Sequence, residues 1–377
     1  MVYEVAEDSL LLAKAVRKYA KGSVLDMGTG SGVQAITASK KKAVSKVLAV
    51  DVDPEAVKYV KKQSAKKVTV KKSDLFSNVK GKFDTIVFNP PYLPQDNGVE
   101  DIALYGGKGG YELTLRFLED VGEHLETNGV LLLLFSSLTR KEVIDDALWK
   151  GLFDYETVGQ SVHFMEKLYV YKVTKNKVRK TLEGKGAKKL SYFDKGKRGL
   201  IYSGKYRGKK IAMKIKNPSS AALGRIANEA RWLKKLNKEG IGPKLLFSGP
   251  HYIAYKFVEG KFILDWLDTA TKKAAYGVLK KCLKQCYRMD ELGVSKEEMH
   301  RPVKHILVKG SNVVMLDFER THYTKKTHNV TQFVTFITNR IVQSRIKLPV
   351  KHLLKLAGNY RKDPKVFKKI LAIFAAS

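Results

Sequence analysis

The sequence predicts two domains: an α/β domain over residues 1–175 and a basic domain over residues 190–377. Length is the first reason, because 377 residues exceed what one hydrophobic core needs. The second is the alternation of apolar strand-like runs with helical stretches over residues 10–173, which is typical of a parallel sheet covered by helices. The third is charge. Of the formal net charge of +34, residues 1–175 carry about +2 and the remainder about +32, which indicates different surfaces and different partners.

The strands of the first domain are expected where apolar runs end in glycine or polar residues. Four runs are interpreted as buried strands: Ser23–Met27, Val47–Asp51, Thr85–Asn89 and Val130–Ser136. The segment that begins at Val173 is polar and charged and offers few apolar side chains to bury, so residues 176–189 are interpreted as a basic linker. The second domain opens with glycine-rich, β-prone sequence and then becomes helical, which predicts an α+β domain.

Composition excludes several classes of protein. The hydrophobic share of 44% is that of a globular chain, and no apolar run approaches the roughly 20 residues that span a bilayer. The acidic start of the chain lacks the basic region of a signal peptide. Cys282 and Cys286 are the two cysteines, spaced as on one helix, which favours core packing over a zinc site or a disulfide. We therefore expect a cytoplasmic protein without membrane contact.

A glycine-rich turn follows the first expected strand. The sequence Val24-Leu25-Asp26-Met27-Gly28-Thr29-Gly30-Ser31-Gly32 runs from a strand into Asp-x-Gly-x-Gly-x-Gly. Gly28, Gly30 and Gly32 let the backbone turn tightly and approach a ligand at a helix N-terminus. This turn predicts a nucleotide-containing ligand, and by itself it fits either a dinucleotide or S-adenosylmethionine.

Three acidic residues sharpen that prediction. Asp51 ends the second strand, 19 residues after the last glycine of the turn, where a carboxylate can accept both ribose hydroxyls. Asp26 precedes the first glycine, where it would repel a pyrophosphate but can face the cationic methionine end of S-adenosylmethionine. Asp74 follows the third strand and is placed to accept from the adenine amino group. Asp53-Pro54 is interpreted as a helix N-cap with proline in the first turn.

The fourth strand ends in Asn89-Pro90-Pro91-Tyr92, at the edge of the sheet where ligands bind in open α/β folds. The Asn89 side-chain oxygen and the Pro90 carbonyl can each accept one N–H of a planar amide or amino group. They would hold its nitrogen toward a reactive methyl group, while Tyr92 packs against the plane of the substrate. Catalysis by such a site is mostly orientation plus a reactive cofactor. The expected cofactor is S-adenosylmethionine.

Residues 1 to about 175 resemble the HemK-type protein-glutamine methyltransferases, in particular their short archaeal and eukaryotic branch. The resemblance rests on Tyr3–Ser9, the glycine turn, Asp51, Asp74, Asn89–Pro94, Gly106–Gly110 and Phe164–Val170. It implies a Rossmann-like class I methyltransferase fold with a mostly parallel seven-stranded sheet. One departure is Tyr105, which stands where the family carries an acidic residue before the glycines.

The resemblance also implies a substrate and a partner. The family methylates the glutamine of the Gly-Gly-Gln motif in class 1 translation release factors, and its eukaryotic members act with a small zinc-binding activator subunit. Asn-Pro-Pro-Tyr also occurs in enzymes that methylate adenine N6 or guanine N2. The motif alone therefore leaves an RNA or DNA amino-methyltransferase open.

Residues 188–340 resemble RIO-like and other atypical protein kinases, with a small lobe over about 190–258 and a helical lobe over about 259–377. The resemblance rests on the glycine-rich segment Gly196–Gly204, Lys214 on the next strand, Glu229 on the following helix, Tyr255–Gly260 as a hinge, and Asp317 in Leu316-Asp317-Phe318-Glu319-Arg320. It implies that Lys214 and Glu229 pair, that Lys214 meets the phosphates of ATP, and that Asp317 binds Mg²⁺.

The catalytic loop of this second domain departs from the kinase pattern. His300-Arg301-Pro302-Val303-Lys304-His305 places Pro302 where the catalytic aspartate belongs, and proline cannot accept a proton. Lys304 could still reach a γ-phosphate. A nucleotide-binding or scaffolding module is favoured, and an active atypical kinase or ATPase remains the alternative.

The charge of the second half suggests one further partner. A surplus of about +32 over residues 176–377 would draw this half to RNA or ribosomes through phosphate neutralisation. The lysines are scattered rather than gathered in one tract, so a generally lysine-rich, solvated surface is the competing interpretation.

Overall fold

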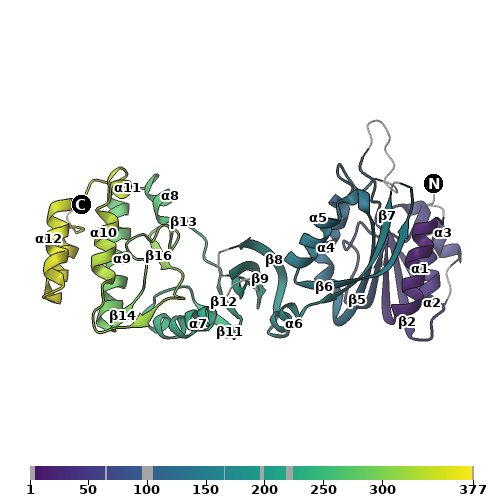
Figure 1. The fold of residues 1–377 in the computed structure, drawn as a ribbon, viewed down its shortest axis with the longest axis horizontal. Coiled ribbons are helices and arrows are strands. Elements are labelled where there is room, and N and C mark those ends of the chain that lie inside the picture. Colours follow the sequence, from purple (N-terminus) through teal and green to yellow (C-terminus); the bar gives the residue numbers. More distant parts are fainter. Residues whose placement is uncertain are drawn as a thin grey trace. The chain divides into compact units, whose positions relative to one another are not determined.

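The structure is a computed structural model. It describes residues 5–63, 66–95, 105–164, 166–195, 199–217 and 224–375. The chain divides into two compact units, Met1–Tyr192 and Phe193–Ser377, which Figure 1 shows in sequence colours.

The first unit is built on a seven-stranded sheet, as the resemblance implies. Its strands lie in the order β3 (Val68–Lys72), β2 (Val44–Asp51), β1 (Gly22–Met27), β4 (Phe83–Phe88), β5 (Leu125–Ser136), β7 (Lys167–Lys175) and β6 (Phe153–Val162). The first five are parallel to their neighbours, whereas β7 runs antiparallel to both β5 and β6. The four expected strands are confirmed in β1, β2, β4 and β5, except that β4 ends at Phe88 and does not include Asn89.

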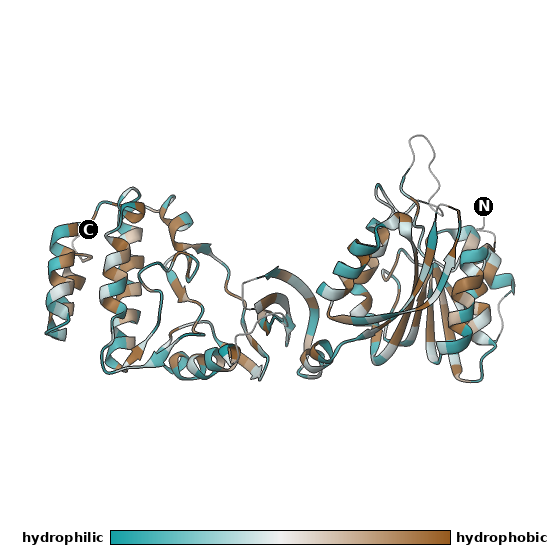
Figure 2. Ribbon diagram, in the orientation of Figure 1, coloured by the Kyte–Doolittle hydropathy of each residue, from teal (hydrophilic) through white to brown (hydrophobic). Residues whose placement is uncertain are grey.

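Helices cover both faces of this sheet because each central strand is apolar on both sides. On one face lie α1 (Glu7–Tyr19), α2 (Val33–Ser39) and α3 (Pro54–Gln63), and on the other lie α4 (Glu112–His124) and α5 (Lys141–Lys150). Neighbouring residues of β1 point to opposite faces, so Val24 joins the core under α1–α3 and Leu25 the core under α4 and α5. Figure 2 shows the central strands as the most hydrophobic part of the unit.

Residues 177–184 differ from the expected linker. They form α6 (Lys177–Gly184), which is part of the first unit. Arg179 is buried there because its Nε donates to Glu183 Oε1 at 2.8 Å and its guanidinium lies 4.7 Å from the ring centre of Phe153. The segment therefore packs by burying a neutralised charge together with the apolar Leu182.

A five-stranded sheet, whose first strand along the chain crosses the boundary at Tyr192, is followed by the helices of the second unit, as expected for an α+β domain. The sheet order is β11 (Leu245–Gly249), β12 (Tyr252–Lys256), β10 (Lys209–Lys216), β9 (Gly199–Tyr206) and β8 (Ala187–Lys195), with α7 (Arg225–Leu236) packed on it. The helices that follow are α8 (Ile263–Leu267), α9 (Lys272–Glu291), α10 (Asn329–Ile337), α11 (Arg340–Gln343), α12 (Val350–Tyr360) and α13 (Phe367–Ala372).

Two short sheets lie among these helices, and α9 lies at the centre of the core that the helices and sheets share. One sheet has the order β13 (Lys261–Phe262), β15 (Ile306–Lys309) and β16 (Asn312–Met315), and the other pairs β14 (Val294–Ser295) with β17 (His322–Tyr323). Cys282 and Cys286 on α9 are buried free thiols, which confirms core packing. Burial also raises the pKa of both thiols. Across the described part of the chain, no helix is long and apolar enough to cross a membrane.

Candidate active site

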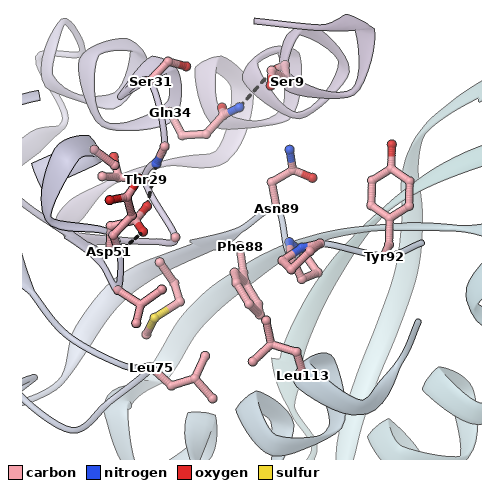
Figure 3. Close-up of a pocket in the computed structure, with 18 of the residues that line it drawn as sticks. Ser9, Thr29, Ser31, Gln34, Asp51, Leu75, Phe88, Asn89, Tyr92 and Leu113 are labelled. Carbon is pink, nitrogen blue, oxygen red and sulfur yellow. Dashed lines mark hydrogen bonds between the residues drawn. The ribbon is translucent and has the colours of Figure 1, made fainter. Parts of the chain in front are cut away.

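A cavity of about 430 Å³ lies in the first unit at the carboxyl ends of β1, β2 and β4 (Figure 3). This is the edge of an open α/β sheet where ligands bind. Its walls come from the start of α1, the turn after β1, the loops after β2, β3 and β4, and the first turn of α4. The cavity therefore collects most of the residues that the sequence singles out in this unit, namely Gly28, Gly30, Asp51, Asp74, Asn89, Pro90 and Tyr92.

The glycine turn adopts the backbone that its sequence predicts. Gly28, Gly30 and Gly32 have φ angles of +61°, +51° and +82°, which glycine alone adopts readily. Gly28 and Gly30 line the cavity, whereas Gly32 does not. A Cβ at Gly32 would lie 3.0 Å from Val60 of α3, so this glycine lets α2 and α3 pack closely behind the turn.

Asp51 lies at the end of β2, buried at the cavity wall. Its Oδ2 accepts from Gly30 N at 2.8 Å, and its Oδ1 accepts from Asp53 N at 2.9 Å. Each carboxylate oxygen has a second lone pair, so both can still accept from a pair of hydroxyls. Asp53 Oδ1 accepts from Glu55 N at 2.8 Å in front of Pro54, which confirms the expected helix cap.

Asp26 lies beneath the glycine turn rather than at the cavity wall. Its Oδ2 accepts from Thr29 Oγ1 at 2.7 Å and from Ala35 N at 3.0 Å, so it fixes the turn to α2. Burial raises the pKa of Asp26 to about 7, and the hydrogen bonds from Thr29 and Ala35 only partly offset that effect. Its direct contact with the methionine end of a cofactor stays a prediction.

Asp74 lines the cavity on the loop after β3. Its Oδ2 lies 3.2 Å from Arg116 Nη2, and both side chains are more than half exposed. An exposed ion pair of this kind is weak, so the carboxylate can also accept from a ligand. Leu75, Phe88 and Leu113 add an apolar wall beside it (Figure 3), which suits a flat aromatic ring.

Asn89 is held by a residue that sequence reasoning did not assign to the site. Its Nδ2 donates to Asp8 Oδ2 of α1 at 2.9 Å. Its Oδ1 is buried and, among the described residues, has no hydrogen-bond partner. Because Asp8 can only accept when ionised, it fixes the amide so that the oxygen stays free. The acidic start of the chain was visible in the sequence. No local pattern, however, indicated that Asp8 would contact Asn89, which follows β4 and lies 81 residues later in the chain.

Pro90, Pro91 and Tyr92 continue the cavity wall after Asn89 (Figure 3). The glycine segment quoted for the family supports this loop from behind. A Cβ at Gly106 would lie 2.4 Å from Pro91 O, and one at Gly110 would lie 2.4 Å from Tyr92 O. These glycines are therefore needed because two stretches of backbone touch. Tyr105 pairs with Leu93 through a β-bridge at the same place.

Gln34 of α2 is a second residue that the sequence analysis missed. Its Nε2 donates to Ser9 O at 2.9 Å, which ties α2 to the start of α1 at the cavity wall (Figure 3). Its Oε1 is buried without a hydrogen-bond partner in the described ranges. Two side-chain amide oxygens, those of Gln34 and Asn89, are thus unsatisfied at one cavity. Buried acceptors of this kind are normally paired, so they indicate donors on a ligand.

The cavity suits S-adenosylmethionine on these observations. Asp51 offers acceptors for the ribose, the glycine turn brings main chain close to the ligand, and the apolar wall beside Asp74 suits the adenine. Asn89 Oδ1 remains as an unsatisfied acceptor at the same cavity, among the described residues.

In the second unit the structure brings together three residues that the sequence predicted, Lys214, Glu229 and Asp317. Lys214 Nζ on β10 lies 2.9 Å from Glu229 Oε2 on α7 and 3.3 Å from Asp317 Oδ1. Glu319 Oε2 is a third partner at 2.9 Å. The three carboxylates offer oxygens within 4.8 Å of one another, and the Lys214 ammonium lies among them.

This cluster is held by strong local electrostatics. Burial lowers the pKa of Lys214, but the three carboxylates outweigh it and hold the pKa above its usual range. Burial raises the pKa of Asp317, yet Lys214, Lys296 and His305 together hold it below its usual range. Asp317 itself has a φ of +61°. The cavity beside it is only about 20 Å³.

Of the other residues that carry the kinase resemblance, Lys304 lies apart from this cluster and His305 lies beside it. Lys304 is exposed on the turn before β15 and does not line that small cavity, so the structure does not bring it to Lys214. His305 Nε2 lies 3.6 Å from Asp317 Oδ2, and buried Lys296 donates to Asp317 O at 2.9 Å. Glu319 and Lys296 were missed by the sequence analysis, although an acid in place of glycine after Phe318 was visible. Residues 196–198 of the glycine-rich segment lie outside the described residues.

A parallel sheet with a ligand cavity at this edge, closed by the glycine turn and the loop after β4, is the fold of a class I S-adenosylmethionine-dependent methyltransferase. Comparison with known proteins makes the class specific. Residues 3–165 match the family model of the methyltransferase small domain. A protein N5-glutamine methyltransferase by name, from Methanocaldococcus jannaschii, is 44% identical over 154 residues, which are 38% of this chain and 77% of that protein. The chain therefore belongs to the family of S-adenosylmethionine-dependent protein-glutamine methyltransferases.

Other relatives are matched over a smaller part of their length. The release factor glutamine methyltransferase of Streptococcus pneumoniae is 32% identical over 124 residues, 29% of this chain and 44% of the relative. The chain thus spans less than half of that bacterial enzyme. Among solved structures, the chain is similar to the E. cuniculi Mtq2–Trm112 complex, which is described as responsible for the methylation of the eRF1 translation termination factor. The two are 26% identical, and the match covers 46% of this chain and 99% of the other, with a TM-score of 0.39.

Proposed function

We propose that this protein methylates the side-chain nitrogen of the glutamine in the Gly-Gly-Gln motif of a class 1 translation release factor. The free, buried Oδ1 of Asn89 carries the proposal, because it is an acceptor fixed at the ligand cavity for one N–H of a planar amide. Relatives named as release factor glutamine methyltransferases support this substrate. A substrate in the translation machinery would place the reaction in the cytoplasm.

The side chains would act by orientation. An amide nitrogen is a poor nucleophile because its lone pair is delocalised. Asn89 Oδ1 accepts one N–H, the Pro90 carbonyl accepts the other, and Tyr92 packs on the amide plane, so the nitrogen presents one face to the cofactor. S-adenosylmethionine, when bound, supplies an electrophilic methyl group.

Cofactor binding divides among the other residues. Asp51 accepts from the ribose hydroxyls, Gly28 and Gly30 bring the main chain close to the ligand, and Asp74 accepts from the adenine amino group. Asp26 and Gly32 act from behind the cavity by holding the turn against α2 and α3.

The test uses the full chain with radiolabelled S-adenosylmethionine, offered a purified class 1 release factor or total RNA in parallel. We expect label in the release factor, released by protease and not by nuclease, and lost when the Gly-Gly-Gln glutamine is replaced by alanine. Label that appears only in RNA would instead support the amino-methyltransferase alternative. A small zinc-binding activator subunit, which the family resemblance implies, would be detected as a rise in rate on adding that subunit.

For the second unit we propose an atypical kinase-like module that binds ATP with Mg²⁺ in a regulatory role. The specific observation is the ion pair of Lys214 with Glu229 at 2.9 Å, beside Asp317 as the Mg²⁺ ligand. Pro302 leaves no carboxylate at the position of a catalytic base, so we expect little or no phosphoryl transfer to proteins. An active atypical kinase or ATPase would have to rely on Asp317 and on a movement of Lys304.

Binding of RNA or ribosomes by the second half remains a proposal that rests on net charge. Its measurement is a salt titration of binding to single-stranded RNA, for which log affinity should fall against log salt with a slope of roughly −0.7 per neutralised phosphate. A flat titration would indicate that the lysines form a solvated surface and do not bind RNA.

A further inference from the structure

The hairpin between β6 and β7 exposes apolar side chains at its tip. Phe164 is fully exposed, at 102% of its reference accessible area, and Val162 is 64% exposed. Burial of each such side chain in an interface would contribute about 1.5–3 kcal/mol of favourable free energy. Neighbouring exposed apolar side chains of this size mark a contact surface more often than an isolated one does.

The tip is fixed in place by hydrogen bonds on both sides. His163 N donates to Glu166 O at 2.7 Å, which closes the hairpin. Lys167 N donates to Ser137 Oγ at 3.0 Å, which ties the hairpin to the end of β5. These bonds hold the hairpin at His163 and Lys167, on either side of the tip.

This tip adjoins the substrate end of the active site. His163 Nδ1 lies 3.1 Å from Glu7 Oε2 at the first turn of α1. The next residue, Asp8, holds the Asn89 amide at 2.9 Å. Leu10, three residues after Glu7 and so on the same side of α1, is 50% exposed. The hairpin tip thus contacts the first turn of α1, the turn whose Asp8 holds the Asn89 side chain.

We propose that Leu10, Val162 and Phe164, here called the tip patch, bind the surface of the substrate protein that flanks the methylated glutamine. This inference rests on the proposed function. The amide that Asn89 holds is small and supplies orientation more than affinity, so affinity must come from contacts outside the cavity. Aromatic side chains are enriched among the residues that supply affinity in protein interfaces.

The chemistry of the tip favours a protein over a nucleic acid. The stretch Val162–Phe164 carries no lysine or arginine, and a phosphate backbone is recognised chiefly by such cations. A folded protein that displays a glutamine on a loop would present apolar and polar surface beside it, which matches the tip patch.

The test compares Phe164→Ser with the unsubstituted full chain, using a purified class 1 release factor and a short Gly-Gly-Gln peptide as substrates. We expect KM for the release factor to rise about tenfold, which corresponds to about 1.4 kcal/mol, with kcat unchanged. KM for the peptide should not change, because the peptide is too short to reach the tip. Phe164→Tyr should restore the KM for the protein.

Leu354→Ser is the matched control, because Leu354 is 46% exposed on α12 in the other unit. It should leave all constants unchanged. An unchanged KM for the release factor in Phe164→Ser overturns the inference while leaving the proposed function intact. Failure of the unsubstituted protein to methylate the release factor overturns the proposed function and this choice of partner together. A dimer in sedimentation velocity that Phe164→Ser dissolves, without a change in KM, would assign the tip patch to a second copy of the chain.

Discussion

The two units treat their functional polar groups in opposite ways. In the first, Asn89 Oδ1 and Gln34 Oε1 are left without partners in the described structure, beside a cavity of about 430 Å³. In the second, Lys214 donates to three carboxylates at once, beside a cavity of only about 20 Å³. The first site has vacant acceptors beside its cavity, whereas Lys214 of the second site has its donors engaged by carboxylates. The second unit also has room for a ligand, because a cavity of about 540 Å³ is lined by Phe257, Val258 and Glu259 of the expected hinge.

This contrast separates a site with free acceptors from one whose lysine is already neutralised. An unsatisfied buried acceptor costs stability, of the order of 1–3 kcal/mol, and such a cost is consistent with a site shaped for a donor that arrives with the ligand. A lysine neutralised by three acids gains nothing from an incoming phosphate until at least one acid withdraws. The first unit should therefore bind without rearrangement, and the second should bind nucleotide only after an exchange of partners.

The largest effect should come from Asn89→Ala. Orientation of reacting groups can supply roughly 7–11 kcal/mol, so methylation of the release factor should fall by orders of magnitude while affinity for S-adenosylmethionine is kept. Rates and calorimetry on the same protein separate the two. Asn78→Ala, an exposed asparagine of the same unit, serves as the control. Normal turnover by Asn89→Ala would remove the amide clamp from the mechanism.

A smaller effect is expected for Asp51→Ala, in binding rather than chemistry. Each charge-assisted hydrogen bond to the ribose contributes about 1.5–3 kcal/mol, so affinity for S-adenosylmethionine should fall tenfold or more (about 1.4 kcal/mol per factor of ten). Calorimetry with the isolated cofactor measures it. Asp146→Ala removes an exposed acid of the same unit and should leave the affinity unchanged. Equal affinity in both variants would refute the ribose assignment.

The buried carboxyl of Asp26 predicts a pH dependence of stability. Its pKa is raised from 3.8 to about 7 by burial. Below the lower value both folded and unfolded chains hold the proton. Between the two values only the folded chain does, so stability falls as pH rises, by at most about 1.4 kcal/mol per pH unit, and the loss is complete above pH 7.

Asp26→Asn removes this titration. Between pH 5 and 7, unfolding measurements without cofactor should therefore show the unsubstituted protein losing up to about 2–3 kcal/mol more than the variant. Parallel curves for the two proteins would show that Asp26 is already ionised in the folded chain.

The smallest expected effect is a change in the affinity of the second unit for ATP with Mg²⁺. Glu319→Gln removes one of the three negative charges around Lys214 and leaves a weaker, neutral acceptor that a phosphate can replace, so affinity for ATP with Mg²⁺ should rise about fivefold, near 1 kcal/mol. Lys214→Ala and Asp317→Ala should weaken it. Weaker binding in Glu319→Gln would make Glu319 a metal ligand instead of a competitor. No binding by any of the four proteins would leave a scaffold.

Much of the first site could be read directly from sequence because its parts are local. A glycine turn between a strand and a helix, an acid at the end of the next strand and Asn-Pro-Pro-Tyr after the fourth strand each fix their backbone through immediate neighbours. Parallel strands then bring their carboxyl ends to one edge. The Lys214–Glu229 pair was predictable for a similar reason, since a strand and the following helix placed them together.

What only the tertiary structure decided concerns partners far apart in the chain. Asp8 reaches Asn89 because α1 packs on the sheet, Asp26 turns beneath the glycine loop instead of facing the cavity, and α6 buries Arg179 where composition indicated a linker. The physical reason is common to all three. The partner of a polar side chain is chosen by which elements pack together and by the need to satisfy every buried charge and hydrogen bond, and no short stretch of sequence contains that information.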